Sequence, residues 1–115
     1  MKRKTMNVYI RTAARQDILR QLSYYLDDKD APAIAHRFLN AVESAMEMLR
    51  RTPEVGAPKG LENPNLLGLR SWPISGFPAM RIYYIHTSDT LRIVRVLHGR
   101  RDINPLLEEE SGSED

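Results

Sequence analysis

Two runs rich in β-branched and aromatic residues, joined by a short polar link, constrain the fold of this chain more than any other feature. The runs cover residues 81–86 and 91–98, and Ser88, Asp89 and Thr90 lie between them. This pattern is typical of a β-hairpin. Side chains alternate along a strand, so the second run is expected to be apolar on both faces. One face would hold Leu91, Ile93, Arg95 and Leu97, and the other would hold Arg92, Val94, Val96 and His98. Such a strand needs cover on both sides.

The chain before the hairpin predicts one strand and two helices. Residues 7–11 alternate between apolar and polar side chains, which indicates a short strand. Thr12 is the expected N-cap of a first helix, whose apolar stripe ends at the acidic segment 27–29. Asp30 is the expected N-cap of a longer helix, with Pro32 in its first turn. Thr52 and Pro53 end that helix, because the residue before proline disfavours helical geometry.

The remaining segments complete a small α+β domain. Residues 53–64 are rich in Pro, Gly and Asn and predict a loop, and residues 69–72 predict a third strand before a turn at 75–78. The expected order is therefore a strand, two antiparallel helices and three strands, with the helices packed on one face of a mostly antiparallel sheet. Only residues 103–107 are left to cover the other face. We therefore expect that face to be partly apolar, rich in arginine and exposed, as partner-binding surfaces are.

Charge divides the chain into a basic body and an acidic tail. Residues 108–115 hold five acids and no base, so residues 1–107 carry 17 bases against 10 acids, a net charge of +7. We expect a single domain over 1–107 and a disordered tail over 108–115. A basic, arginine-rich body suits nucleic acid or an acidic protein as partner, and a merely solvated surface remains the alternative.

Targeting signals and cysteine chemistry are not expected. No apolar run approaches the ~20 residues that span a bilayer, and the N-terminus does not resemble a signal peptide. These features predict a cytoplasmic protein that does not associate with membranes. The chain has no cysteine, which excludes disulfides and thiolate metal sites.

Few residues offer chemistry for catalysis. The three histidines lack the spacing of metal ligands, and neither a glycine-rich phosphate loop nor a nucleophile constellation is present, so no metal or cofactor is predicted. Metal-free RNA cleavage needs an acid, a base and cations around the phosphate. The residues of suitable type are Arg81, Tyr84, Arg95, His98, Arg100 and Arg101, with Lys59 from the loop. Each also has a plain structural interpretation as a strand or surface residue.

Several segments together resemble one known family. They are residues 69–74, 76–78, 81–84 and 93–103, and the last includes Arg-Val-Leu-His-Gly-Arg-Arg-Asp at 95–102. With the helix pair and the turn after it, they resemble the ParE branch of the RelE/ParE superfamily over nearly the whole chain except the tail. Members are small α+β toxins of type II toxin-antitoxin modules, neutralised by an antitoxin whose C-terminal part wraps around the toxin.

The resemblance implies partners and roles for individual residues. A ParD-like antitoxin would form a hetero-oligomer with the chain, and a toxin dimer is the alternative state. The resemblance implies that Arg81 and Arg95 pair with antitoxin carboxylates. Leu69, Trp72, Tyr84 and Leu97 would form the apolar groove or the core beneath it. His98, Arg100 and Arg101 would contact the target.

The branch of the superfamily decides whether the chain is an enzyme. ParE members are associated with inhibition of DNA gyrase, whereas RelE members cleave ribosome-bound mRNA. Arg81 lies where RNA-cleaving relatives place a phosphate-binding arginine, and His98 lies near where some keep a catalytic histidine. The loop around Lys59, however, lacks the acidic residue or the lysine cluster of those relatives, and Gly99 replaces an aromatic residue. The pattern favours a non-enzymatic gyrase inhibitor that stabilises a plasmid. A metal-free endoribonuclease is the alternative, and a module without toxicity is a third interpretation.

Overall fold

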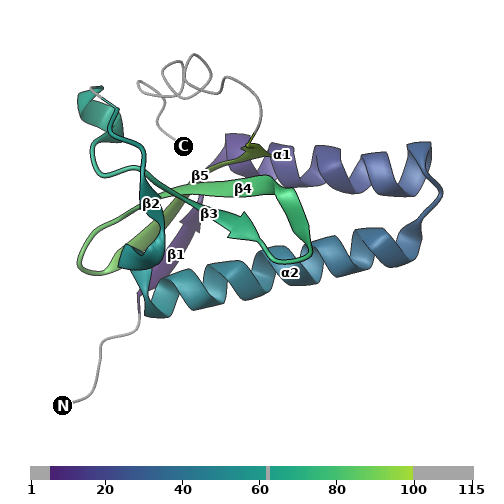
Figure 1. The fold of residues 1–115 in the computed structure, drawn as a ribbon, viewed down its shortest axis with the longest axis horizontal. Helices are drawn as coiled ribbons and strands as arrows, with labels where there is room; N and C mark the ends of the chain where they lie inside the picture. The colour runs from purple at the N-terminus through teal and green to yellow at the C-terminus, as the bar shows by residue number, and fades with distance from the viewer. Residues whose placement is uncertain (1–5, 62, 100–115) are drawn as a thin grey trace.

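The chain folds into two helices packed on a five-stranded sheet (Figure 1). The structure is a computed structural model that describes residues 6–61 and 63–99. The helices are α1 (Thr12–Ser23) and α2 (Pro32–Arg51). The strands are β1 (Asn7–Ile10), β2 (Ala57–Pro58), β3 (Arg70–Ile74), β4 (Phe77–His86) and β5 (Thr90–His98). Short helical turns follow α1 at Tyr24–Asp28 and α2 at Pro53–Val55, and a third lies at Pro64–Leu66.

The sheet has the order β1-β5-β4-β3-β2. β1 pairs with β5 in parallel, and the other pairs are antiparallel. The parallel pair arises because both helices lie between β1 and the other strands in the sequence, so the chain crosses over before it returns beside β1. The predicted α+β class with two helices on one face of a mostly antiparallel sheet is confirmed. β2, which lies inside the predicted loop, adds a fifth strand.

Both predicted N-caps are wrong by one position. Thr12 is the first residue of α1 and Arg11 occupies the N-cap, whereas Ala31 is the N-cap of α2. Asp30 instead has a positive φ of 48°, a conformation that Asp adopts more readily than most residues. It redirects the chain after the π-helical turn at Tyr24–Asp28. Pro32 begins α2 as predicted, where its missing N–H is of no consequence.

An irregularity in the β4–β5 pair changes which side chains share a face. Tyr83 pairs with Arg95 but Tyr84 pairs with Ile93, so Val94 is an extra residue in β5. A bulge of this kind reverses the alternation beyond it. Val96 therefore joins Leu91 and Ile93 on the helix side, and Leu97 joins Val94 on the other side. The predicted faces of Val96 and Leu97 are wrong because strict alternation ignores the bulge.

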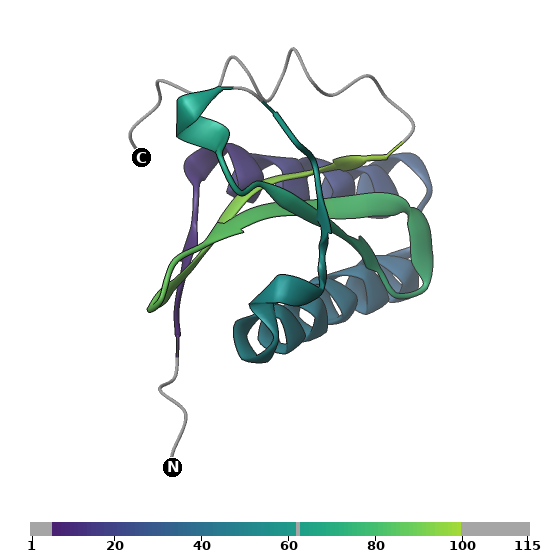
Figure 2. The same ribbon diagram turned by 60° about the vertical axis from the view of Figure 1, so that its left-hand side comes forward.

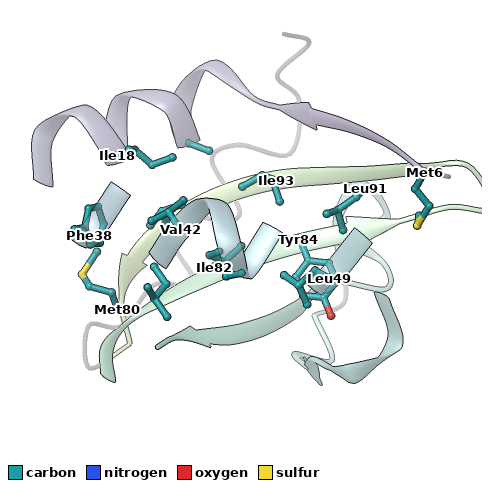
Figure 3. Packing of buried hydrophobic residues seen from close by; sticks show 14 residues of the cluster. Met6, Ile18, Phe38, Val42, Leu49, Met80, Ile82, Tyr84, Leu91 and Ile93 are labelled. Carbon is teal, nitrogen blue, oxygen red and sulfur yellow. The ribbon is translucent and has the colours of Figure 1, made fainter. Parts of the chain in front are cut away.

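Most of the core lies between the helices and the sheet (Figure 3). From α2, Phe38, Val42 and Leu49 pack onto Ile82 and Ile93 of the sheet. We call this group the helix-facing cluster. Its buried members are Met6, Ala14, Ile18, Phe38, Val42, Ala45, Leu49, Ile74, Met80, Ile82, Tyr84, Leu91, Ile93 and Val96.

The opposite face of the sheet is covered by the loop that connects β2 and β3. Figures 1 and 2 show this loop, with its helical turn at Pro64–Leu66, on the side of the sheet away from α2. Leu66 and Leu69 pack on Tyr83, Val94 and Leu97 of the sheet, a group that we call the loop-covered cluster. The expectation that only residues 103–107 would cover this face is therefore wrong. Residues 103–107 themselves lie outside the described part of the chain.

Candidate functional site

Arg95 forms a buried ion pair at the edge of the sheet. β1 pairs with β5 only as far as Ile93, and α1 then runs beside the edge of β5. There the Asp17 carboxylate accepts hydrogen bonds from Arg95 Nε at 2.7 Å and from the Val96 backbone N–H at 3.0 Å. The side chains of Arg95 and Asp17 are 11% and 1% exposed. The charge of Arg95 is thus balanced within the chain. Asp17 also accepts the hydrogen bond of the Val96 N–H, which lies at the edge of β5 where no strand pairs with it.

Tyr84 belongs to the core beneath the sheet. Its side chain is fully buried in the helix-facing cluster. The hydroxyl donates a hydrogen bond to the Pro53 carbonyl at 2.7 Å and accepts one from the Gly56 N–H at 2.9 Å. Burial raises the pKa of Tyr84, although the Gly56 hydrogen bond and the Arg70 charge oppose the shift. Tyr84 therefore anchors the segment after α2 to the sheet.

Arg81 lies on the loop-covered side of β4. Its Nε donates a hydrogen bond to Ser71 Oγ at 3.1 Å. Gly99 lies beside the aliphatic part of the side chain, where an added Cβ would approach Arg81 Cδ to 2.8 Å. The Arg81 side chain can therefore lie against this position only because Gly99 has no Cβ. Arg81 also opposes the rise in the pKa of Tyr83 that burial causes.

His98 lies on the helix side, at the end of β5. It borders a depression of about 580 Å³ whose other residues come from α1 and the turn after it. They are Arg20, Gln21, Ser23, Tyr24, Asp27 and Asp28. His98 is exposed there, and two carboxylates rather than Arg81 are its neighbours around the depression.

The structure does not bring the five described candidates for RNA cleavage together. Tyr84 is buried on the helix side and Arg95 is paired with Asp17. Arg81 and His98 lie on opposite sides of the sheet. Arg100 and Arg101 lie outside the described residues, while Lys59 extends over the Tyr83 ring at 5.9 Å on the loop-covered side. The set is therefore a pattern in the sequence that the described fold separates.

The apolar candidates also divide between the two sides. Leu69 and Leu97 are buried in the loop-covered cluster. Trp72 instead packs against the helix-facing cluster, where it lines a groove of about 440 Å³ between α2 and β3. The residues from α2 in this groove are Asn40, Ala41, Ser44, Ala45 and Met48. Trp72 is the one proposed groove residue that lines an open groove in the described part of the chain.

Two features of the sheet's surroundings were missed in the sequence. Asp17 lies three residues after Ala14 and beside Ile18, so it sits on the buried stripe of α1. A carboxylate on such a stripe signals a buried partner. Leu61, Leu66 and Leu69 gave a second signal, since three leucines in a loop rich in Gly, Pro and Asn need an apolar surface to cover.

In the ranges 6–61 and 63–99, no three His, Cys, Asp or Glu residues are grouped so that they could hold a metal ion. No helix in these ranges is long and apolar enough to cross a membrane.

Comparison with known proteins places this fold in a family. The family model described as the ParE toxin of the type II toxin-antitoxin system parDE matches residues 8–103. A sequence search of curated proteins gave no significant match. Among solved structures, the chromosomal ParDE system from P. aeruginosa contains a chain with a TM-score of 0.65 and 16% identity, over 82% of this chain and 96% of that one.

A second solved structure is more similar in sequence. It is the toxin-antitoxin complex RelBE2 from Mycobacterium tuberculosis, with a TM-score of 0.57 and 26% identity, over 87% of this chain and 98% of that one. The first structure supports the fold, and the family model covers most of the chain. The chain therefore belongs to the ParE toxin family of type II toxin-antitoxin systems.

Proposed function

We propose that this toxin inhibits DNA gyrase by binding to it and does not cleave RNA. The separation of the acid–base candidates supports this proposal. General acid–base catalysis requires the participating groups within hydrogen-bond reach of the reacting atoms. Tyr84 is instead buried with its hydroxyl bonded to backbone groups, and Arg81 and His98 lie on opposite sides of the sheet. The family resemblance supplies gyrase as the target. Such a toxin would act in the cytoplasm and would stabilise the plasmid or chromosomal segment that encodes the module.

A ParD-like antitoxin is the proposed partner. The two solved structures compared above are described as a toxin-antitoxin system and a toxin-antitoxin complex. The groove between α2 and β3 supports a helical antitoxin segment as occupant, because small residues of α2 allow close approach and Trp72 offers an apolar wall. Arg81 remains a proposed contact for an antitoxin carboxylate. For Arg95 this role requires that a partner carboxylate add to or replace Asp17.

The target is tested with purified toxin in two parallel assays. We expect gyrase supercoiling to be inhibited, or cleaved DNA to be trapped, while mRNA on ribosomes remains intact. Addition of antitoxin should reverse the inhibition. Cleaved mRNA with unaffected gyrase would overturn the proposal in favour of the endoribonuclease, and that cleavage should then be lost in His98→Ala. An absence of toxicity when the toxin is expressed without antitoxin would instead support a module that has lost its activity.

The antitoxin contacts are tested by calorimetry. Trp72→Ala and Arg81→Ala should each weaken antitoxin binding, whereas Arg37→Ala, at an exposed position of α2, should leave it unchanged. Unchanged affinity in both test variants would exclude these two contacts. Arg95→Ala needs a parallel stability measurement, since it also removes the buried ion-pair partner of Asp17 and leaves that carboxylate with Val96 N–H and Arg20.

A further inference from the structure

A shallow depression on the loop-covered side of the sheet presents apolar and cationic groups to solvent. It has a volume of about 290 Å³ and lies between the β2–β3 loop and the hairpin of β4 and β5. We call it the Arg92 patch, and its lining residues are Asn65, Leu67, Ile85, Thr87, Thr90 and Arg92. Leu67 is 62% exposed, although the leucines on either side of it in the loop pack in the cluster below.

The charged side chains on this side of the sheet are mainly cationic. The carboxylate nearest the patch is that of Asp89, which accepts hydrogen bonds from the lining residues Thr87 at 3.2 Å and Thr90 at 3.0 Å. None of the lining residues of the Arg92 patch is acidic. The guanidinium of Arg92 lies over the Tyr9 ring at 5.7 Å, so it is held on the surface of the sheet. Lys59 and Arg81 add two further cations on the same side, the first over Tyr83 and the second beside Ser71. A ligand for this surface must therefore be acidic and carry apolar groups for Leu67 and Ile85.

The chain's own C-terminal segment has this composition. Leu106 and Leu107 are followed directly by Glu108, Glu109 and Glu110, and residues 108–115 contain five acids and no base. We propose that this segment docks in cis on the Arg92 patch. The two leucines cover Leu67 and Ile85, and the glutamates pair with Arg92 and Lys59.

The length of the chain permits this contact. Arg92 lies seven residues before Gly99 in the sequence, which corresponds to roughly 23 Å along a strand at ~3.3 Å per residue. Glu108 follows Gly99 by nine residues, so an extended chain reaches about 30 Å. The segment can therefore turn back beside β5 and place its first three glutamates at Arg92.

Tethering favours the segment over a free acidic partner. A short flexible linker holds a ligand at an effective concentration in the millimolar range. A contact between the glutamates and the patch is thus populated in most molecules when its dissociation constant lies below this effective concentration. The docked segment would screen the body's net charge of +7 and reduce its non-specific attraction to phosphate polymers. This inference concerns the chain alone and does not depend on gyrase as the target.

Nuclear magnetic resonance of the full chain tests the contact. We compare the natural sequence with the variant E108Q/E109Q/E110Q at low ionic strength. The backbone amides of Ile85, Thr90 and Arg92 should change chemical shift, and about 1 M salt, where the Debye length is about 3 Å, should remove the difference. A matched control, D27N/D28N/E43Q, neutralises three exposed acids that do not line the patch and should leave these amides unchanged.

Charge reversal gives a second, independent measurement. Arg92→Glu, at an exposed position, should abolish the difference between the glutamate and glutamine tails. Combining R92E with E108K/E109K/E110K should restore a salt-sensitive contact. Identical shifts for the glutamate and glutamine tails in the natural body would overturn the proposal. Shift differences that grow with protein concentration would also overturn it, because they would place the tail of one molecule on the patch of another.

Discussion

The two faces of the sheet are covered in different ways. The helix-facing cluster is buried under two helices and contains an aromatic group in which Phe38 meets Phe77 edge-on at 5.2 Å and Tyr25 at 5.7 Å. The loop-covered cluster has five buried members, and only the β2–β3 loop among the described segments packs on it. The same two strands, β4 and β5, supply both clusters.

This difference in cover leads us to expect different roles for the two faces, stability for the helix side and partner binding for the loop-covered side. Helices bury a continuous apolar stripe and support one another, so the helix-facing side should dominate the free energy of unfolding. A short loop covers only part of a face and leaves the Arg92 patch open beside it. Loops also open locally at lower cost than packed helices. We therefore expect substitutions on the helix side to unfold the domain and those on the loop side to loosen it locally.

The largest effect is expected at the centre of the helix-facing cluster. Phe38→Ala should destabilise the domain by about 3–5 kcal/mol, because a fully buried aromatic ring leaves a cavity between α2 and the sheet. Denaturant unfolding measures this change. Leu39→Ala, at the exposed neighbouring position, is the matched control and should change stability little. A comparable loss in both variants would contradict the assignment of the dominant core.

The edge where the two faces meet should be the next most sensitive region. Asp17→Ala should cost about 3 kcal/mol, since it leaves the Arg95 guanidinium and the Val96 N–H without their carboxylate. The double variant Asp17→Ala/Arg95→Ala should cost less than the two single variants added together. Glu47→Ala, which removes an exposed pair with Arg50, is the control and should have little effect. Strict additivity of Asp17 and Arg95 would argue against the pair.

A smaller and more local effect is expected under the loop. Leu66→Ala should cost about 2 kcal/mol, at the low end for a buried leucine, because the loop can collapse into the space. Hydrogen exchange should accelerate at the Leu66 and Leu69 amides, which donate to Asn63 and Leu66 carbonyls, and should stay slow at Ile82 in β4. Equal acceleration at all three amides would show that the two faces unfold as one unit.

Two adjacent tyrosines compare the faces directly. Tyr84→Phe should cost about 1–2 kcal/mol, because the buried Gly56 N–H and Pro53 carbonyl lose their partner. Tyr83→Phe, one residue away on the loop-covered side, should cost less, since among the described residues no such pair of backbone groups depends on its hydroxyl. Thermal unfolding of both variants measures the difference. A larger loss for Tyr83→Phe would reverse the ranking of the two faces.

The smallest effect is a dependence on alkaline pH. Burial raises the pKa of both Tyr83 and Tyr84 from an ordinary value of 10.0. As the pH rises, tyrosine in the unfolded chain loses its proton before tyrosine in the folded chain does. The titration of these two groups should therefore leave the free energy of unfolding constant below about pH 10 and lower it as the pH rises above that value. Unfolding free energies measured from neutral to alkaline pH should show this decline. The decline should be weaker in Tyr83→Phe and in Tyr84→Phe, and a stability that rises above pH 10 would contradict the assignment.

The candidate site was predictable in part. The family resemblance assigned partner contacts to Arg81 and His98 and placed Trp72 in the groove or the core beneath it. All three side chains are at least partly accessible in the structure. The fold separates Arg81, Tyr84, Arg95 and His98, which the sequence offered as one set for acid–base chemistry. The position of a residue along a strand does not show whether a bulge will move its side chain to the other face of the sheet. Nor does it show whether an ion pair within the chain already neutralises its charge. The partner of Arg95 lies 78 residues away in the sequence, beyond any local pattern.

The amino-acid sequence by itself determined the order of the two helices and of every strand except β2, together with the α+β class and the family resemblance. These follow from local periodicity, from proline and glycine positions and from short motifs, all of which act within a few residues. Only the tertiary structure decided that Val94 bulges, that Asp17 closes the edge of β5 and that the β2–β3 loop covers the second face. These features arise from packing between segments distant in the chain, where shape and the need to satisfy buried polar groups outweigh local preference.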